Sequence, residues 1–189
     1  MMYIIKPAAT LFITAAITIA ALSVVHTLTL EPIETQKRKT QEAAMREVLP
    51  GAGEYREIPA EKSGSIVAVY EGRPGGKGSS GSLVGYVVQL APEGYSGAID
   101  LIAGISVPDK KITGVRVLRH SETPGLGALA VKEDFYRRYD GKELLPLGVV
   151  RASPGEQEIQ AITSATITTR AITRAVNEAI AWYHAQGGE

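Results

Sequence analysis

The chain has 189 residues, a formal net charge of zero from 20 basic and 20 acidic side chains, and no cysteine. The balanced charge gives no indication of a nucleic-acid partner, and the lack of cysteine excludes disulfides, thiolate catalysis, iron–sulfur clusters and cysteine-ligated zinc. A redox role would therefore depend on a bound organic cofactor.

The first predicted element is a membrane-spanning helix. Residues 8–30 contain no Asp, Glu, Lys or Arg, and a helix of that length reaches about 34 Å, enough to cross the hydrocarbon core of a bilayer. A cleaved signal peptide is the alternative, but the apolar run is longer than a usual signal core and no convincing small-x-small cleavage site follows it. We therefore predict that residues 1–31 anchor the chain in the cell (inner) membrane by a single pass, in contact with lipid.

The charges that flank this helix bear on its orientation. Lys6 and the amino terminus lie on one side, and Lys37, Arg38 and Lys39 lie on the other. Counted by the positive-inside rule, these residues favour a cytoplasmic C-terminal domain. Long domains can be translocated regardless of charge, however, and acidic residues lie among the basic ones.

After the anchor, the sequence predicts a polar helix and then one folded domain. Residues 32–50 begin at a proline, alternate in charge and end at Pro50-Gly51, which indicates a solvated linker helix. We expect residues 51–189 to form a single domain that is large enough to bury a core.

The domain has the pattern of an α+β fold. Short β-rich runs separated by turn residues indicate a mixed, largely antiparallel sheet, and they cover residues 65–70, 83–90, 98–105, 111–117 and 149–151. A short helix is predicted over residues 132–139, with Phe135, Tyr136 and Tyr139 turned toward the core. The chain ends in an amphipathic helix that opens at Thr166. From Thr168 its apolar face recurs as Ile172, Ala175, Val176, Ala179, Ile180 and Tyr183.

Four hydroxyl side chains gather where this last helix begins: Thr163, Ser164, Thr166 and Thr168. A helix start presents unpaired N–H groups and the positive end of the helix dipole, so it suits a phosphate. The hydroxyls could hydrogen-bond a phosphate or be esterified by one. The alternative is that Thr163 or Ser164 only caps the helix.

The segment 162–168, Ile-Thr-Ser-Ala-Thr-Ile-Thr, resembles the flavinylation motif of the FMN-binding domain family. That family includes the G subunit of the Rnf electron-transport complex and the C subunit of the sodium-pumping NADH:quinone reductase. The resemblance implies that Thr166 carries FMN through a phosphoester bond. It also implies contacts to the cofactor from Thr163, Ser164, Ala165 and Ile167. The chain departs from the motif at Gln160, where the family often has Asp.

A second segment, Ser121–Gly127, resembles the other signature loop of the family and precedes the first by about forty residues. Its glycines let the backbone approach a ligand closely, and its proline stiffens the turn. The resemblance implies that this loop forms a wall of the cofactor site through Glu122, Thr123, Gly125, Leu126 and Gly127.

Together, the two segments imply an electron-transfer subunit with covalent FMN in a membrane ion-translocating ferredoxin:NAD oxidoreductase of the Rnf type. The resemblance also implies other membrane and peripheral subunits as partners, a separate flavin transferase for maturation, and a C-terminal domain on the extracytoplasmic side. We expect no metal site and no complete active site in this chain. Two alternatives remain: the FMN-carrying component of a sodium-pumping NADH:quinone reductase, and a membrane-anchored binding or scaffold domain without cofactor.

Overall fold

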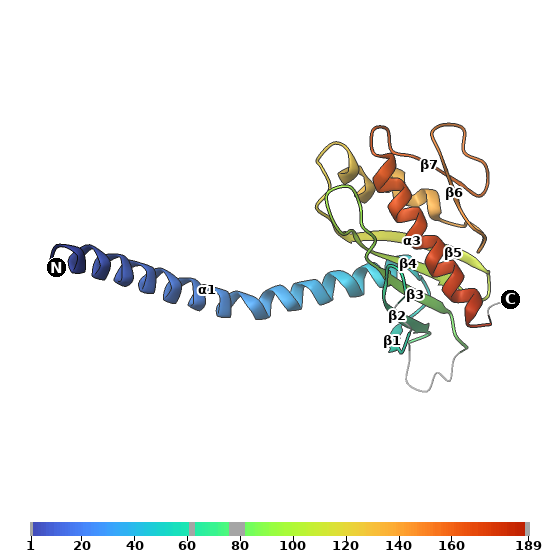
Figure 1. Ribbon diagram of the computed structural model, residues 1–189. Coiled ribbons are helices and arrows are strands. Elements are labelled where there is room, and N and C mark those ends of the chain that lie inside the picture. Colours follow the sequence, from blue (N-terminus) through green and yellow to red (C-terminus); the bar gives the residue numbers. More distant parts are fainter. Residues whose placement is uncertain (1, 61–62, 76–81, 188–189) are drawn as a thin grey trace. The chain divides into compact units, whose positions relative to one another are not determined.

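The structure is a computed structural model that describes residues 2–60, 63–75 and 82–187 (Figure 1). The chain forms two compact units, Met1–Gln41 and Glu42–Glu189. The first unit is helical throughout its described part, and the second contains the sheet and the remaining helices.

The N-terminal helix α1 (Met2–Val48) is continuous where the sequence predicts two helices that meet near Pro32. A proline removes one backbone hydrogen bond from a helix, but the good helix formers that follow Pro32 continue the helix through it. Within the described residues, α1 alone is long and apolar enough to cross a membrane. Several of its threonine hydroxyls bond to the backbone of the same helix, as when Thr18 donates to the Thr14 carbonyl at 2.8 Å, so these polar groups are paired within the apolar stretch.

The second unit contains a five-stranded antiparallel sheet with strands in the order of the sequence. The strands are β1 (Glu54–Ile58), β2 (Ile66–Arg73), β3 (Gly85–Leu90), β4 (Asp100–Ser106) and β5 (Lys111–Arg119). The predicted antiparallel meander is therefore confirmed. Strand β1 was not predicted because its charged side chains hide the β pattern, and such charges suit an edge strand.

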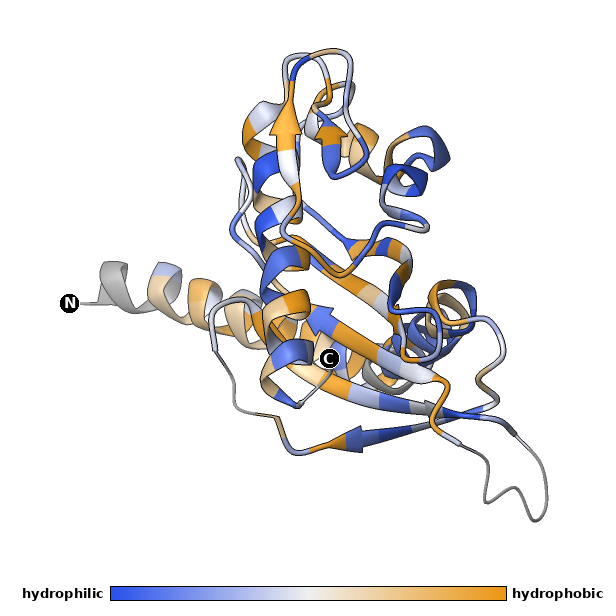
Figure 2. Cartoon of the chain, turned by 90° about the vertical axis from the view of Figure 1, so that its right-hand side faces the viewer, coloured by the Kyte–Doolittle hydropathy of each residue, from blue (hydrophilic) through white to orange (hydrophobic). Residues whose placement is uncertain are grey.

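The C-terminal helix α3 (Thr166–Ala185) packs on one face of this sheet and forms the main core with it. Its predicted apolar face is confirmed, since all six predicted residues are buried. The last turn of α1 contributes to a smaller cluster, in which Val48 and Leu49 pack with Ile102 of β4. Because Leu101 belongs to the main core, β4 alternates between the two clusters, as the period of a strand requires. Figure 2 shows the apolar residues on the strands and on α3.

Short elements connect the sheet to α3. They are η1 (Gly127–Val131), α2 (Glu133–Tyr136), η2 (Arg137–Tyr139) and a parallel pair of strands, β6 (Gly148–Val150) and β7 (Glu158–Gln160). The predicted short helix exists as α2 and η2, with Phe135 and Tyr139 buried. Tyr136 is only half-buried, and the Arg116 guanidinium lies 3.6 Å from the centre of its ring.

Candidate functional site

The start of α3 carries the hydroxyl-rich motif and has no side-chain cap. The helix begins at Thr166, and its N-cap is Ala165. The alternative in which Thr163 or Ser164 caps the helix is therefore wrong. Without a capping side chain, the N–H groups of the first turn remain available to a bound anion.

A buried threonine holds the segment that leads into α3. The hydroxyl of Thr169 donates to the Ala165 carbonyl and accepts from the Ile162 N–H, both at 3.1 Å. Between these two residues, Ser164 has a φ of +65°, in the left-handed region that favours glycine. This backbone leaves Thr166 half-exposed, and its hydroxyl has no hydrogen bond within the described part of the chain.

The second signature loop is held by the carboxylate of Glu122, which is only 5% exposed. One of its oxygens accepts the backbone N–H groups of Tyr95 and Ser96, both at 2.8 Å. The other accepts the hydroxyl of Thr168 at 2.5 Å. One buried side chain thus joins three segments: the loop after β3, the signature loop after β5, and the first turn of α3.

The charge of Glu122 is favoured by its hydrogen bonds. Burial alone would raise the pKa of this carboxyl, but the hydroxyl of Thr168, the N–H groups of Ser96 and Tyr95, and nearby His120 together lower the pKa below its ordinary value of 4.5. The side chain is therefore a carboxylate at neutral pH.

Glycines give the Glu122 carboxylate its space. A Cβ at Gly94 would lie 2.5 Å from one carboxylate oxygen, and a Cβ at Gly127 would overlap the other oxygen and lie 2.7 Å from the Thr168 hydroxyl. Gly125 has a different requirement, since its φ is +77° and a Cβ there would meet nothing. The two glycines of the signature loop are thus needed for different reasons, one steric and one conformational.

Residues of both motifs line one cavity of about 390 Å³. This volume lies within the range of small-molecule sites. Its lining residues are Tyr95, Glu122, Thr123, Leu126, Gly127, Ser164, Ala165, Thr166, Ile167 and Thr168. Most of the predicted site residues therefore lie together, but Thr163 and Gly125 are not among the lining residues.

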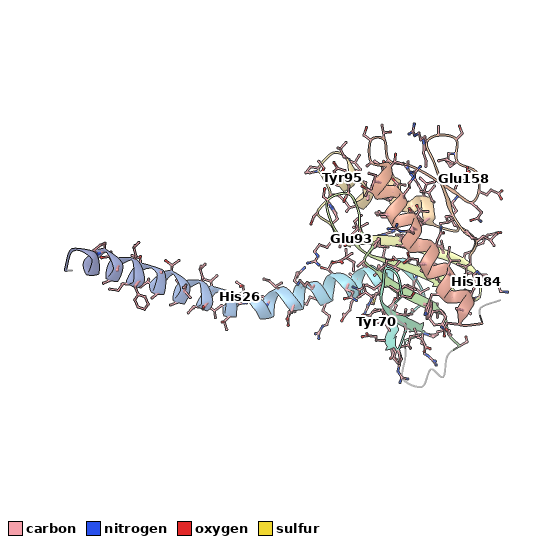
Figure 3. The ribbon with its side chains drawn as sticks, in the orientation of Figure 1. His26, Tyr70, Glu93, Tyr95, Glu158 and His184 are labelled. Atoms are coloured by element: carbon pink, nitrogen blue, oxygen red, sulfur yellow. The ribbon has the colours of Figure 1, made fainter. Side chains whose placement is uncertain are left out.

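The structure adds one lining residue that the sequence did not predict, Tyr95, and it includes Thr168, one of the four hydroxyls at the start of the last helix. Tyr95 is 70% exposed and lies on the loop between β3 and β4 (Figure 3). An aromatic residue inside the turn sequence Pro-Glu-Gly-Tyr-Ser-Gly was the available signal for it. No Lys, Arg or His lines the cavity among the described residues, and the N–H groups of the first turn of α3 supply a partial positive charge there.

Gln160, the position where the family often has Asp, lies at the end of β7 and outside the cavity lining. Its backbone carbonyl accepts a hydrogen bond of 2.5 Å from Arg138, and its side-chain amide donates to the Arg151 carbonyl at 3.4 Å. The side chain is therefore engaged with the β6–β7 loop and not with the hydroxyls of the motif.

Comparison with known proteins places this site within a described family of domains. Residues 94–181 match the FMN-binding domain family, and residues 2–48 match the family of the RnfG N-terminal region. All the residues that line the cavity lie inside the first match.

Relatives of similar length match over nearly the whole chain. The G subunit of the Na(+)-translocating ferredoxin:NAD(+) oxidoreductase complex of Acetobacterium woodii is 36% identical, over 92% of this chain and 88% of the relative. The G subunit of an ion-translocating oxidoreductase complex of Methanosarcina acetivorans is 34% identical, over 98% of this chain and 97% of the relative.

Solved structures share the fold at low sequence identity. The C subunit of the Na(+)-translocating NADH-quinone reductase of Parabacteroides distasonis has a TM-score of 0.59 at 17% identity, over 82% of this chain and 95% of that one. NqrC of Shewanella oneidensis has a TM-score of 0.50 at 21% identity, over 69% of this chain and 66% of that one. The predicted fold class, an apolar N-terminal helix before an α+β domain, is thus confirmed.

Proposed function

This chain belongs to the RnfG family of ion-translocating oxidoreductase (Rnf) complexes, and we propose that it is the member of its complex that carries electrons on FMN. The observation that carries the proposal is the cavity, because the two segments that resemble FMN-family motifs supply all of its lining residues except Tyr95, and because Thr168 is bonded to Glu122 within it. Bound FMN supplies the electron chemistry, and the residues of the chain bind and orient it.

Within the cavity, Thr166 is the hydroxyl best suited to attachment. Its side chain lines the cavity, is half-exposed and has no hydrogen bond within the described residues. By contrast, the hydroxyls of Thr168 and Thr169 are buried and bonded, and Thr163 lies outside the lining. Ser164 also lines the cavity, but it lies before the helix, whereas Thr166 begins α3 and is the position to which the family resemblance assigns the attachment. An FMN phosphate joined to Thr166 would lie at the start of α3, where N–H groups offset its charge.

Attachment requires a base, because a threonine hydroxyl is a weak nucleophile at its own pKa. The only carboxylate that lines the cavity among the described residues is Glu122, and its oxygens accept hydrogen bonds from three donors. Its lowered pKa also makes it a weak base. These features support modification by a separate flavin transferase and not by the chain itself.

The membrane helix and the relatives support a membrane-anchored component of a multi-subunit complex. We take the domain to consist of residues 51–189, on the extracytoplasmic side, with residues 1–31 as the anchor and residues 32–50 as the linker. The helix would pack against lipid and partner subunits. The sodium-pumping quinone reductase is a weaker candidate, because its NqrC proteins resemble this chain in fold at 17–21% identity.

The intact mass of the chain purified from its native membrane tests this proposal. We expect a mass increased by one FMN joined with loss of water, and yellow in-gel fluorescence after denaturing electrophoresis. A chain that has the unmodified mass and no bound flavin would contradict the proposal and support a domain without cofactor. Flavin that is present before denaturation but lost on denaturation would support FMN as the cofactor and contradict the covalent link.

A further inference from the structure

We propose that the buried carboxylate of Glu122 lowers the reduction potential of the flavin held in this cavity. The inference rests on the proposed function, since it requires FMN in the cavity between the signature loop and α3. It assigns to Glu122 an electrostatic role that differs from the direct contact to FMN that the family motif implies.

The position of the charge is fixed by the structure. Glu122 lines the cavity but is only 5% exposed, and hydrogen bonds from the Tyr95 and Ser96 N–H groups and from the Thr168 hydroxyl hold both of its oxygens. A carboxylate held by several donors stays ionised at neutral pH, in agreement with the lowered pKa of this group.

Little in the surroundings neutralises this charge. The cavity lining contains no Lys, Arg or His among the described residues. The nearest imidazole, that of His120, is not among the lining residues, and its Nδ1 accepts the Glu122 backbone N–H at 3.1 Å. The remaining positive feature is the start of α3, and the FMN phosphate would lie against it.

A fixed negative charge beside a redox group opposes the addition of an electron. The electron comes from the neighbouring carrier, or from an electrode in the experiment below, and no bond of the protein forms or breaks. Because Glu122 is poorly exposed, water screens its field less than it would at the surface. A lower potential makes the reduced protein a stronger donor to the next carrier.

The substitution Glu122→Gln separates charge from geometry. The amide oxygen can accept the N–H groups of Tyr95 and Ser96, and the amide nitrogen can donate to the Thr168 hydroxyl, whose oxygen also accepts. The full-length chain, coexpressed with a flavin transferase, would be titrated in a spectroelectrochemical cell. We expect a higher midpoint potential for Glu122→Gln than for the unmodified sequence.

A matched control is Glu178→Gln, which removes a half-buried carboxylate that accepts hydrogen bonds from Ser65. Glu178 is ten residues beyond Thr168, about 15 Å along α3, so its removal should leave the potential unchanged. A second variant, Thr123→Lys, adds a cation to the exposed cavity wall and should raise the potential even if Glu122→Gln does not fold.

The outcomes separate this inference from the proposed function. Equal potentials in Glu122→Gln and the unmodified chain, both with FMN attached, overturn the inference alone. A folded Glu122→Gln that acquires no FMN also overturns the inference alone, because Glu122 would then be needed to build the site. An unchanged potential in Thr123→Lys overturns it as well. A chain of unmodified sequence that acquires no flavin overturns the proposed function and the inference together.

Discussion

The hydroxyl of Thr168 donates a hydrogen bond of 2.5 Å to the carboxylate of Glu122, which is 46 positions earlier in the sequence. This bond joins the signature loop to the first turn of α3, and both of its residues line the cavity. It also occupies Thr168, which leaves Thr166 as the hydroxyl of that turn that faces the cavity without a partner among the described residues.

Replacing Thr166 by Val should abolish covalent flavin and leave the fold intact. The side chain is half-exposed and its hydroxyl has no hydrogen bond among the described residues, so its loss should change the free energy of unfolding by less than about 0.5 kcal/mol. In-gel flavin fluorescence and intact mass measure the result, and Thr166→Ser, which keeps a hydroxyl, is the control. Fluorescence that persists in Thr166→Val would move the attachment to Thr163, Ser164 or Thr168.

Much of the fold was predictable from the sequence, because the elements concerned follow a simple period. The strands of the meander and the apolar face of α3 are examples, since each buries one side against a common core. The apolar period of α3 is visible only from Thr168 onward, because its first turn, Thr166 to Thr168, is rich in β-branched residues.

The arrangement of the site depends on contacts that no local pattern encodes. The two motifs were identified by resemblance, but the bonds from Tyr95 and Ser96 to Glu122 form between segments 26 and 27 positions apart, when two loops meet. Glu122 was predicted to contact the cofactor, yet its oxygens accept hydrogen bonds from the protein. The continuity of α1 through Pro32 likewise depends on many neighbouring residues, whose helix propensity together outweighs the hydrogen bond that one proline removes.

The two glycines of the signature loop should respond differently to alanine. Gly127→Ala places a Cβ against the Glu122 carboxylate and the Thr168 hydroxyl, so we expect a loss of about 1–3 kcal/mol of stability and less attached flavin. Gly125→Ala meets no atom and only strains a φ of +77°, at about 1–2 kcal/mol. Chemical denaturation and flavin occupancy measure both. Equal flavin occupancy in the two variants would show that the contact at Gly127 does not shape the site.

The left-handed backbone of Ser164 should be sensitive to the shape of its side chain. Ser164→Gly should retain stability within about 1 kcal/mol, because the relief of strain at φ +65° offsets the greater freedom of glycine in the unfolded chain. Ser164→Val should destabilise by at least about 1 kcal/mol and reduce flavinylation, because a β-branched residue is poorly tolerated at positive φ. If Val is tolerated as well as Gly, the conformation at this position does not restrict the motif.

Glu122 should make stability dependent on pH in the acid range. A carboxyl whose folded pKa lies below its ordinary value of 4.5 stabilises the fold above that pH, and the contribution is lost as the pH falls through the lowered pKa. Denaturation of the detergent-solubilised chain at several pH values measures this. The advantage of the unmodified sequence over Glu122→Gln should shrink as the pH falls below the ordinary value of 4.5. A stability difference that stays constant from neutral to acid pH would contradict the assignment of an ionised Glu122.

The last prediction concerns the side of the membrane on which the domain lies, where the positive-inside count and the family resemblance disagree. The chain has no cysteine, so Ser153→Cys introduces a single thiol on the exposed β6–β7 loop with little change in size. If the domain is extracytoplasmic, a membrane-impermeant maleimide should label this thiol in intact cells whose outer barriers, where present, have been opened. The unmodified chain measures the background, and lysed cells give the full extent of labelling. Labelling that occurs only after lysis would place the domain in the cytoplasm, as Lys37, Arg38 and Lys39 favour, and its electrons would then have to be exchanged with carriers on that side.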